Sequence, residues 1–243
     1  MDYILHKINQ RISLAQVTGN TSAIGVHYRS RIEYLLNLML GYLWNKNFQM
    51  LDEDEKIKVF GDIICPSIGT VVSVCRTLDV QKEIFSVKQI TKCIDSYPDI
   101  RNNQMGHGFV FEDSKEASDA QYADLYDSLM SVTNGFFAQE RVFVFVQSKQ
   151  GNICKGIQYC SDGDVRPWSL PLEVADLPEG NLYIQYQDNY YCISPFIKIE
   201  DLGDSIYTYA KTTEKLLGRI HYNKLINTGT LDEVWEPFSN LYV

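Results

Sequence analysis

Apolar residues recur at three- and four-residue steps through the first half of the chain, which is the period of an amphipathic helix. The clearest stretch spans 22–46, where Asn20, Thr21 or Ser22 is placed to cap the first turn. Its apolar stripe consists of Ile24, Tyr28, Ile32, Leu35, Leu36, Met39, Leu40 and Leu43. The same period predicts further helices over 2–16, 52–65, 67–78, 86–97 and 118–137. Pro66 separates two of them, and Pro98 follows another.

The period changes to that of strands at residue 141. RVFVFVQS (141–148) predicts a strand that forms a hairpin with 151–160, and 181–199 predicts two strands joined at Asp188-Asn189. Three prolines predict a loop over 161–180, and a last helix is expected at about 204–223. We therefore predict an α+β fold. A helical bundle over 1–140 carries a small antiparallel sheet, a C-terminal helix and a tail over 141–243, packed on the bundle.

The bulk composition is that of a globular protein. With 243 residues, 45% hydrophobic and 22% charged, the chain is long enough for a sizeable core, and wholesale disorder is excluded. The apolar runs 35–40 and 142–146 are too short to cross a bilayer. The N-terminal residues do not resemble a signal peptide. We expect a cytoplasmic protein with no membrane association.

The net charge and the spacing of the cysteines and histidines limit the range of possible functions. The formal net charge of −9 excludes a broad basic face, so any contact with nucleic acid is expected to be local or to come from a partner. None of the six cysteines forms a CxxC pair or lies at zinc-ligand spacing from a histidine. We expect reduced cysteines, no metal and no cofactor.

The segment RNNQMGH (101–107) carries the strongest chemical signal. Arg101 offers a permanently charged planar fork that matches phosphate oxygens. His107, with an ordinary pKa of about 6.5, is suited to take a proton from a ribose 2′-hydroxyl or to give one to the leaving oxygen. Asn102 is placed to hydrogen-bond the phosphate or to orient the imidazole. This set of groups needs no metal.

The spacing of the two charged groups requires a special geometry. Six positions along a regular helix turn through about 600°, which leaves Arg101 and His107 about 240° apart. Gly106 and Gly108 flank the histidine and are able to bend or end the helix. Alternatively, two copies of the segment meet across a symmetric dimer and build one groove.

The arrangement of arginine, a polar residue, four further residues and histidine resembles the signature of the HEPN (higher eukaryotes and prokaryotes nucleotide-binding) domains. The resemblance covers about residues 1–140. It implies a dimeric helical bundle and a metal-independent endoribonuclease of a bacterial toxin or anti-phage defence system, with Arg101, Asn102 and His107 as catalytic residues. It also implies RNA as substrate and allows a regulatory protein partner. Phe109 stands where one HEPN subgroup has a tyrosine that is modified, so silencing by that route is not expected.

Two other interpretations remain open for the segment. One is structural: a helix-terminal arginine in a surface ion pair and a histidine beside a capping glycine. The other is a non-catalytic HEPN-like dimerisation or recognition module, possibly the N-terminal part of a larger defence or signalling protein, or a nucleotide-binding domain that does not cleave. The acidic charge favours this second class.

Other residues have simpler expected roles. His27 is expected to pack half-buried in the long helix, and His221 to sit near the end of the last helix, where the dipole favours it. Arg29, Arg31 and Glu33 are expected on a solvated or paired face, from which Arg31 or Glu33 is able to reach the 101–107 segment. SDGD (161–164) predicts a turn rather than a calcium site. Strand packing is the expected role of Tyr183, Tyr186, Tyr190 and Tyr191.

Overall fold

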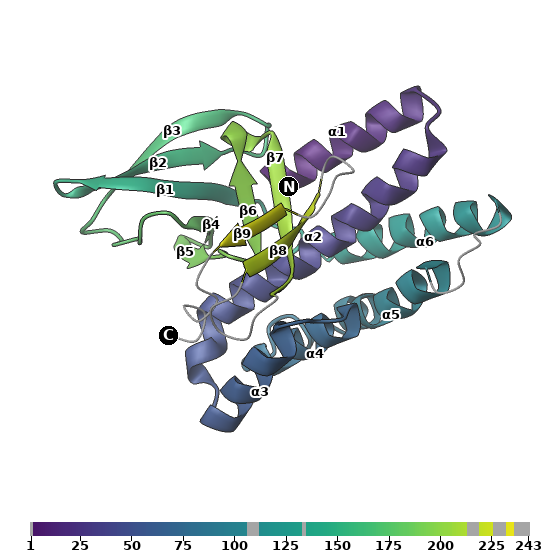
Figure 1. Ribbon diagram of the computed structural model, residues 1–243, viewed down its shortest axis with the longest axis horizontal. Helices are drawn as coiled ribbons and strands as arrows, with labels where there is room; N and C mark the ends of the chain where they lie inside the picture. The colour runs from purple at the N-terminus through teal and green to yellow at the C-terminus, as the bar shows by residue number, and fades with distance from the viewer. Residues whose placement is uncertain (1, 106–111, 133–134, 213–218, 226–231, 236–243) are drawn as a thin grey trace.

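The computed structural model describes residues 2–105, 112–132, 135–212, 219–225 and 232–235. It has the predicted α+β fold, with helices first and antiparallel sheets after them (Figure 1). The helices are α1 (Tyr3–Val17), α2 (Thr21–Asn47), α3 (Glu53–Ile63), α4 (Ile68–Leu78), α5 (Lys88–Met105) and α6 (Glu112–Met130). The strands are β1 (Val142–Gln150), β2 (Ile153–Tyr159), β3 (Val165–Pro171), β4 (Leu182–Tyr186), β5 (Asn189–Cys192), β6 (Ile197–Glu200), β7 (Ser205–Thr212), β8 (Arg219–Lys224) and β9 (Asp232–Trp235).

Side-chain caps fix where the helices begin. The Asn20 side chain accepts a hydrogen bond from the N–H of Ala23, which confirms the predicted start of α2. Asp52 and Glu55 form a reciprocal capping box at the start of α3. Ser67 caps α4 directly after Pro66. These local signals are why the first helices follow the sequence prediction closely.

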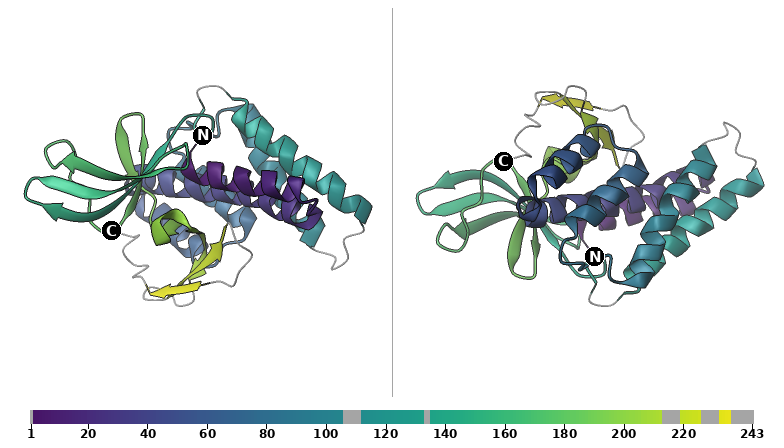
Figure 2. Two further views of the ribbon diagram at one scale, coloured as in Figure 1. Left: turned by 90° about the horizontal axis from the view of Figure 1, so that it is seen from above. Right: turned by 90° about the horizontal axis from the view of Figure 1, so that it is seen from below.

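Helix α2 is the central element of the bundle. Its 27 residues extend about 40 Å, and α1, α4 and α6 all pack against it. Figure 2 shows the β1–β5 sheet at one end of the molecule and the α5–α6 pair at the opposite end. The second sheet lies beside α2 between these two ends. The middle of α2 therefore faces both the α5–α6 pair and the second sheet.

Two antiparallel sheets replace the single sheet that was expected. The five-stranded sheet has the order β3-β2-β1-β4-β5, and its β1–β2 hairpin confirms the prediction for 141–160. The prediction for 181–199 is right in part: β4 and β5 form the expected pair, but the turn between them is at 187–188, and the end of the range forms β6 of the second sheet. The predicted loop over 161–180 is wrong in part, because β3 pairs with β2 along its whole length. Pro167 and Pro171 are compatible with this strand since it lies at the sheet edge.

The second sheet, with the order β6-β7-β8-β9, occupies the region of the predicted C-terminal helix. That prediction, a helix over 204–223, is wrong. Strand β7 reads SIYTYAKT, a run rich in β-branched and aromatic residues that favours a sheet. It pairs with β6 on one side and with β8 on the other, so its backbone hydrogen bonds are satisfied by pairing between strands rather than within a helix.

The prediction that helix α5 ends near Tyr97, before the proline at position 98, is wrong. Pro98 lies inside the helix, which continues to Met105. A proline in a helix interior removes one hydrogen bond and strains the turn before it. Packing of α5 against α6 and α4 stabilises the helix through that position. As a result, Arg101 lies one helical turn beyond Tyr97, on the same face of α5.

One hydrophobic core joins the helices to both sheets. At its centre, the Tyr42 ring of α2 packs against Phe136, Tyr186 and Tyr191, with ring centroids 4.6, 5.6 and 4.8 Å away. The opposite face of the five-stranded sheet has a smaller core of its own, built from Val144, Val146, Cys154, Leu177 and Tyr183. None of the described helices is long and apolar enough to cross a membrane.

The close approach of α2 to the segment before β6 predicts the effect of a small substitution. A β-carbon added at Gly41 would lie 3.1 Å from Cβ and 3.2 Å from Cα of Ile193. We expect Gly41→Ala to lower the free energy of unfolding by about 1 kcal/mol, because the crowding exceeds the gain in helix propensity. Gly61→Ala in α3 is the control: nothing lies within 4 Å of that position, so stability should rise. Urea unfolding measures both, and a stabilised Gly41→Ala protein would contradict the packing.

Candidate functional site

The structure describes two of the three residues that the sequence singled out. Arg101 lies on α5 with its side chain 34% exposed, and Asn102 beside it is exposed. His107 lies outside the described residues, as do Gly106, Gly108 and Phe109. The arginine and asparagine are therefore accessible from solvent, and their helix supplies one wall of a site.

The carboxylate of Glu33 on α2 interacts with Arg101 and with the polar groups around it. Oε1 of Glu33 lies 3.9 Å from Nε of Arg101 and 3.5 Å from Nε of Arg29. The Tyr97 hydroxyl donates a hydrogen bond of 3.3 Å to the same oxygen. Glu33 therefore does reach the 101–107 segment, as the sequence interpretation allowed. It holds the arginine from α5 against the middle of α2.

The site is electrostatically balanced. Asp119 of α6 also lies against α2, since its Oδ1 would be 2.4 Å from a β-carbon added at Gly25. The charges of Arg29, Arg101, Glu33 and Asp119 all act on Tyr122, and burial, the largest effect, raises the pKa of this tyrosine to about 12. Two positive and two negative groups cancel formally, so an anion that binds Arg101 competes with Glu33 for it.

Burial and Glu33 together keep the nearby tyrosine neutral. Tyr97 is almost fully buried, and this burial, reinforced by the negative charge of Glu33, raises its pKa well above the ordinary value. The hydroxyl consequently keeps its proton and donates a hydrogen bond to Glu33 at every physiological pH. Its role is to fix the carboxylate in place rather than to transfer a proton.

Arg101 also lines a cavity of about 310 Å3 between the helices and the second sheet. Its apolar walls include Leu36, Ile68 and Val71, and its polar walls include Asn37, Ser67 and Asn223. The Nε–H group of Arg101 is buried and has no hydrogen-bond partner among the described residues. A donor in this state favours a ligand that supplies the missing acceptor. The volume is at the lower end of the range for ligand pockets.

Several secondary predictions have clear outcomes. His27 is half-buried in α2 as expected, and burial together with nearby Arg11 lowers its pKa. Arg31 is not on a solvated face: it is 8% exposed, and its guanidinium stacks 3.9 Å from the centre of the Tyr126 ring. The prediction of a helix-dipole role for His221 is wrong, because this residue lies in strand β8.

The remaining two predictions are confirmed. SDGD forms a turn in which the Arg166 side chain bonds both Asp162 and Asp164, each at 2.8 Å. The four tyrosines of β4 and β5 are buried or half-buried in the sheet and its neighbours. No group of three or more His, Cys, Asp or Glu side chains that could hold a metal ion occurs in the described part of the chain.

Sequence reasoning missed the groups that the fold brings to Arg101 from a distance. Tyr97 carries a weak signal, since it precedes Arg101 by four residues on a helix. Asn37, Ser67 and Asn223 carry none, because they come from α2, the start of α4 and β8. No family model, curated protein or solved structure matches the chain. What this site can do chemically is therefore inferred from its own residues and not from a relative.

Proposed function

We propose that this protein is a metal-independent endoribonuclease of the HEPN type, acting as a homodimer in bacterial anti-phage defence or a toxin system. The observation that carries the proposal is the Arg101 side chain, half-exposed beside a cavity with a buried Nε–H that has no hydrogen-bond partner among the described residues. A phosphodiester oxygen supplies the acceptor that this donor lacks. The RNA contact is local, which suits an acidic chain.

In the proposed reaction, His107 removes the proton from a ribose 2′-hydroxyl, and the 2′-oxygen attacks the adjacent phosphorus. The bond from phosphorus to the 5′-oxygen breaks, and the leaving oxygen receives a proton from the imidazolium of His107, so that no net proton is gained or lost. Arg101 stabilises the negative charge that develops on the phosphate oxygens, and Asn102 hydrogen-bonds the phosphate or the imidazole. The products are a 2′,3′-cyclic phosphate and a 5′-hydroxyl.

The test is cleavage of single-stranded RNA by the purified protein in EDTA. We expect fragments that polynucleotide kinase labels at the 5′-end without prior dephosphorylation, since the 5′-ends are hydroxyls. Cleavage that stops in EDTA, or fragments with 5′-phosphates, would contradict the proposal. Intact RNA at every protein concentration would favour the second candidate below.

The charge balance around Arg101 favours one alternative, a non-catalytic HEPN-like dimerisation or recognition module. Glu33 neutralises the arginine in the absence of RNA. Such a module would self-associate and bind a protein partner while leaving RNA intact. Because both candidates are dimers, light scattering on the purified protein tests the self-association that they share, and the cleavage assay separates them.

If Glu33 competes with the phosphate, removing its charge should strengthen RNA binding. We expect Glu33→Gln to bind a 2′-deoxy-substituted RNA about two- to fivefold more tightly, the effect of one partly exposed ion pair. Fluorescence anisotropy at fixed salt measures it. Glu83→Gln is the matched control, because Glu83 likewise accepts from a tyrosine hydroxyl, that of Tyr42, and pairs with a cation, Lys46. Equal affinities for both variants would show that Glu33 does not restrain Arg101.

A further inference from the structure

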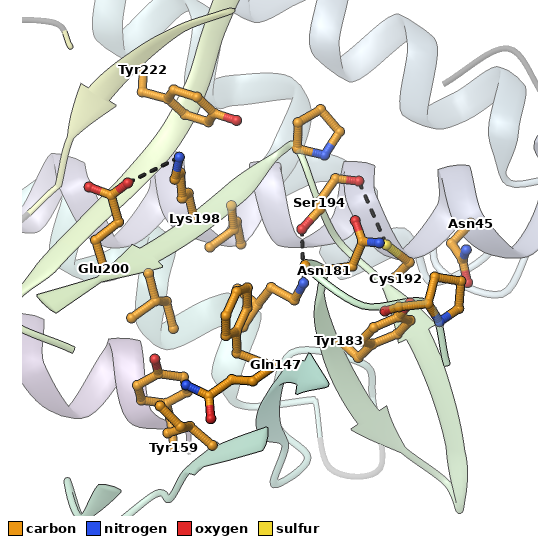
Figure 3. A pocket seen from close by; sticks show the side chains of 18 of the residues that line it. Asn45, Gln147, Tyr159, Asn181, Tyr183, Cys192, Ser194, Lys198, Glu200 and Tyr222 are labelled. Atoms are coloured by element: carbon orange, nitrogen blue, oxygen red, sulfur yellow. Dashed lines mark hydrogen bonds and ion pairs between the residues drawn. The ribbon is translucent and has the colours of Figure 1, made fainter. Parts of the chain in front are cut away.

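A second cavity, which Arg101 does not line, has a volume of about 1020 Å3 and lies between the two sheets (Figure 3). One wall is the helix-facing side of the five-stranded sheet, with Phe145, Ile157 and Leu182. Another wall comes from Ile220 and Tyr222 of β8. The volume is at the upper end of the range for ligand pockets, and these walls are apolar and aromatic.

One edge of strand β6 borders this cavity and pairs with no other strand in the described part of the chain. Among the described strands β6 is terminal in its sheet and pairs with β7, and the N–H of its first residue, Ile197, donates to the carbonyl of Ile193. The N–H of Tyr209 donates to the carbonyl of Phe196. This bond determines which residues of β6 form backbone hydrogen bonds with β7. Alternate residues then bond to β7, so Lys198 and Glu200 turn their backbone groups toward it. The N–H and C=O groups of Ile199 consequently point away from β7.

The free edge of β6 faces the cavity. All four residues of the strand, Ile197–Glu200, line it. A strand that presented one of its faces would contribute only alternate residues, since successive side chains point to opposite sides. A continuous run of four therefore indicates that the edge itself lies along the cavity.

Some of the polar side chains that line the cavity already bind other groups of the protein. Nζ of Lys198 is 3.0 Å from Oε1 of Glu200, and the Ser194 hydroxyl accepts a hydrogen bond of 2.9 Å from the N–H of Leu182. Figure 3 shows the pair of Lys198 and Glu200 among the residues that line the cavity. The backbone N–H and C=O groups of Ile199 are hydrogen-bonding groups that this cavity offers in addition to its polar side chains, among them Asn45 and Gln147.

An exposed apolar residue stands at the end of the same edge. Leu202 lines the cavity, is 68% exposed, and has a φ of 54°, a conformation that is strained for a residue with a β-carbon. Strained residues of this kind cluster at ligand clamps and binding sites. Its side chain extends the apolar wall beyond the last residue of β6.

We propose that this cavity binds an extended peptide segment of a partner protein, which adds as a strand to the edge of β6. Its backbone would pair with Ile199 at the usual spacing of about 4.8 Å between strands. Apolar side chains at alternate positions would pack on Phe145, Ile157 and Leu182. A strand edge together with an apolar wall selects a peptide over a nucleotide, because the ligand must supply main-chain groups at regular intervals.

The test uses a fluorescent peptide of eight alternating valine and threonine residues followed by one lysine. Its binding to the full chain is followed by anisotropy. We expect a dissociation constant of about 10–100 μM. N-methylation of the four valines and N-methylation of the four threonines block opposite edges of the peptide strand. One of these peptides should bind at least about tenfold more weakly and the other nearly unchanged, since only one edge pairs with β6. Equal losses, or no binding below about 1 mM, would overturn the proposal.

A surface variant locates the binding on the protein. Leu202→Asp places a charge at the rim and is expected to weaken the peptide about fivefold or more. Ile153→Asp is the control, since Ile153 is also an exposed apolar residue, 41% exposed, but lies outside this cavity. Equal affinities of the two variants would overturn the assignment of the site. RNA cleavage plays no part in either measurement, so their outcome is independent of the proposed nuclease activity.

Discussion

Replacing Arg101 with alanine is expected to lower the rate of RNA cleavage by about 10²- to 10⁴-fold, and His107→Ala should have an effect of the same order. The guanidinium is the cation placed to stabilise the developing phosphate charge, and the imidazole is the group that moves the proton. Cleavage of a fluorescent oligoribonucleotide in EDTA measures both rates. Arg101→Ala should also reduce the dependence of RNA affinity on salt by about one phosphate contact.

Arg166→Ala is the control for these variants. Arg166 lies in β3, directly after the 161–164 turn, and its side chain is 55% exposed. The partners of this side chain among the described residues are Asp162 and Asp164. Its removal takes one positive charge from the surface without touching the α2–α5 site. Cleavage rates that fall equally in Arg101→Ala and Arg166→Ala would mean that general charge, not the site, determines the activity.

Mixing the Arg101→Ala and His107→Ala variants tests whether two copies of the chain share one groove. If Arg101 of one protomer works with His107 of its partner, a mixed dimer of the two variants has one site with both groups intact. A re-equilibrated equal mixture should then recover about a quarter of the wild-type activity, since half of its dimers are mixed and each has one of two sites. No recovery would place both groups of a site in a single chain.

The helical half of the fold was predictable because its signals are local. The Asp52–Glu55 capping box, Ser67 and Asn20 each mark a helix start within a few residues of sequence. The errors arose where pairing between distant segments decides the structure. Strand β7 is stabilised by β6 and β8, and β3 by β2, and such pairing is not visible in the local pattern of apolar residues. The helix end predicted at Pro98 is wrong for the same reason, because the packing of α5 against α6 and α4 outweighs the local preference of the proline.

The candidate site shows the same division. Arg101 and Asn102 were singled out from seven consecutive residues, and Glu33 was suggested because it lies on a long helix with other charged residues. The geometry that matters, one carboxylate oxygen shared by Arg29, Arg101 and Tyr97, depends on how α2 and α5 pack. Spacing along the chain carries no information about that packing. The cavity beside Arg101 depends further on β7 and β8, which were predicted as helix.

A buried ion pair joins the first residues of the chain to the start of the first sheet. The side chains of Asp2 and Arg141 are both fully buried, and Nη2 of Arg141 lies 2.9 Å from Oδ2 of Asp2. Arg141 also donates hydrogen bonds to the carbonyl oxygens of Phe136 and Phe137. Asp2 in turn caps α1 by accepting from the N–H of Leu5. One arginine therefore holds together α1, the segment after α6 and the start of β1.

Arg141→Met is expected to lower the free energy of unfolding by about 3–5 kcal/mol, because it leaves the carboxylate of Asp2 buried without its partner. Urea unfolding followed by circular dichroism measures the change. Asp2→Asn keeps an acceptor for the N–H of Leu5 while removing the charge, so in the double variant with Arg141→Met much of the loss should be restored. This recovery separates the cost of an unpaired charge from the loss of packing. A single Arg141→Met variant within about 1 kcal/mol of the wild type, or a double variant no more stable than it, would show that the carboxylate is not confined as the structure describes.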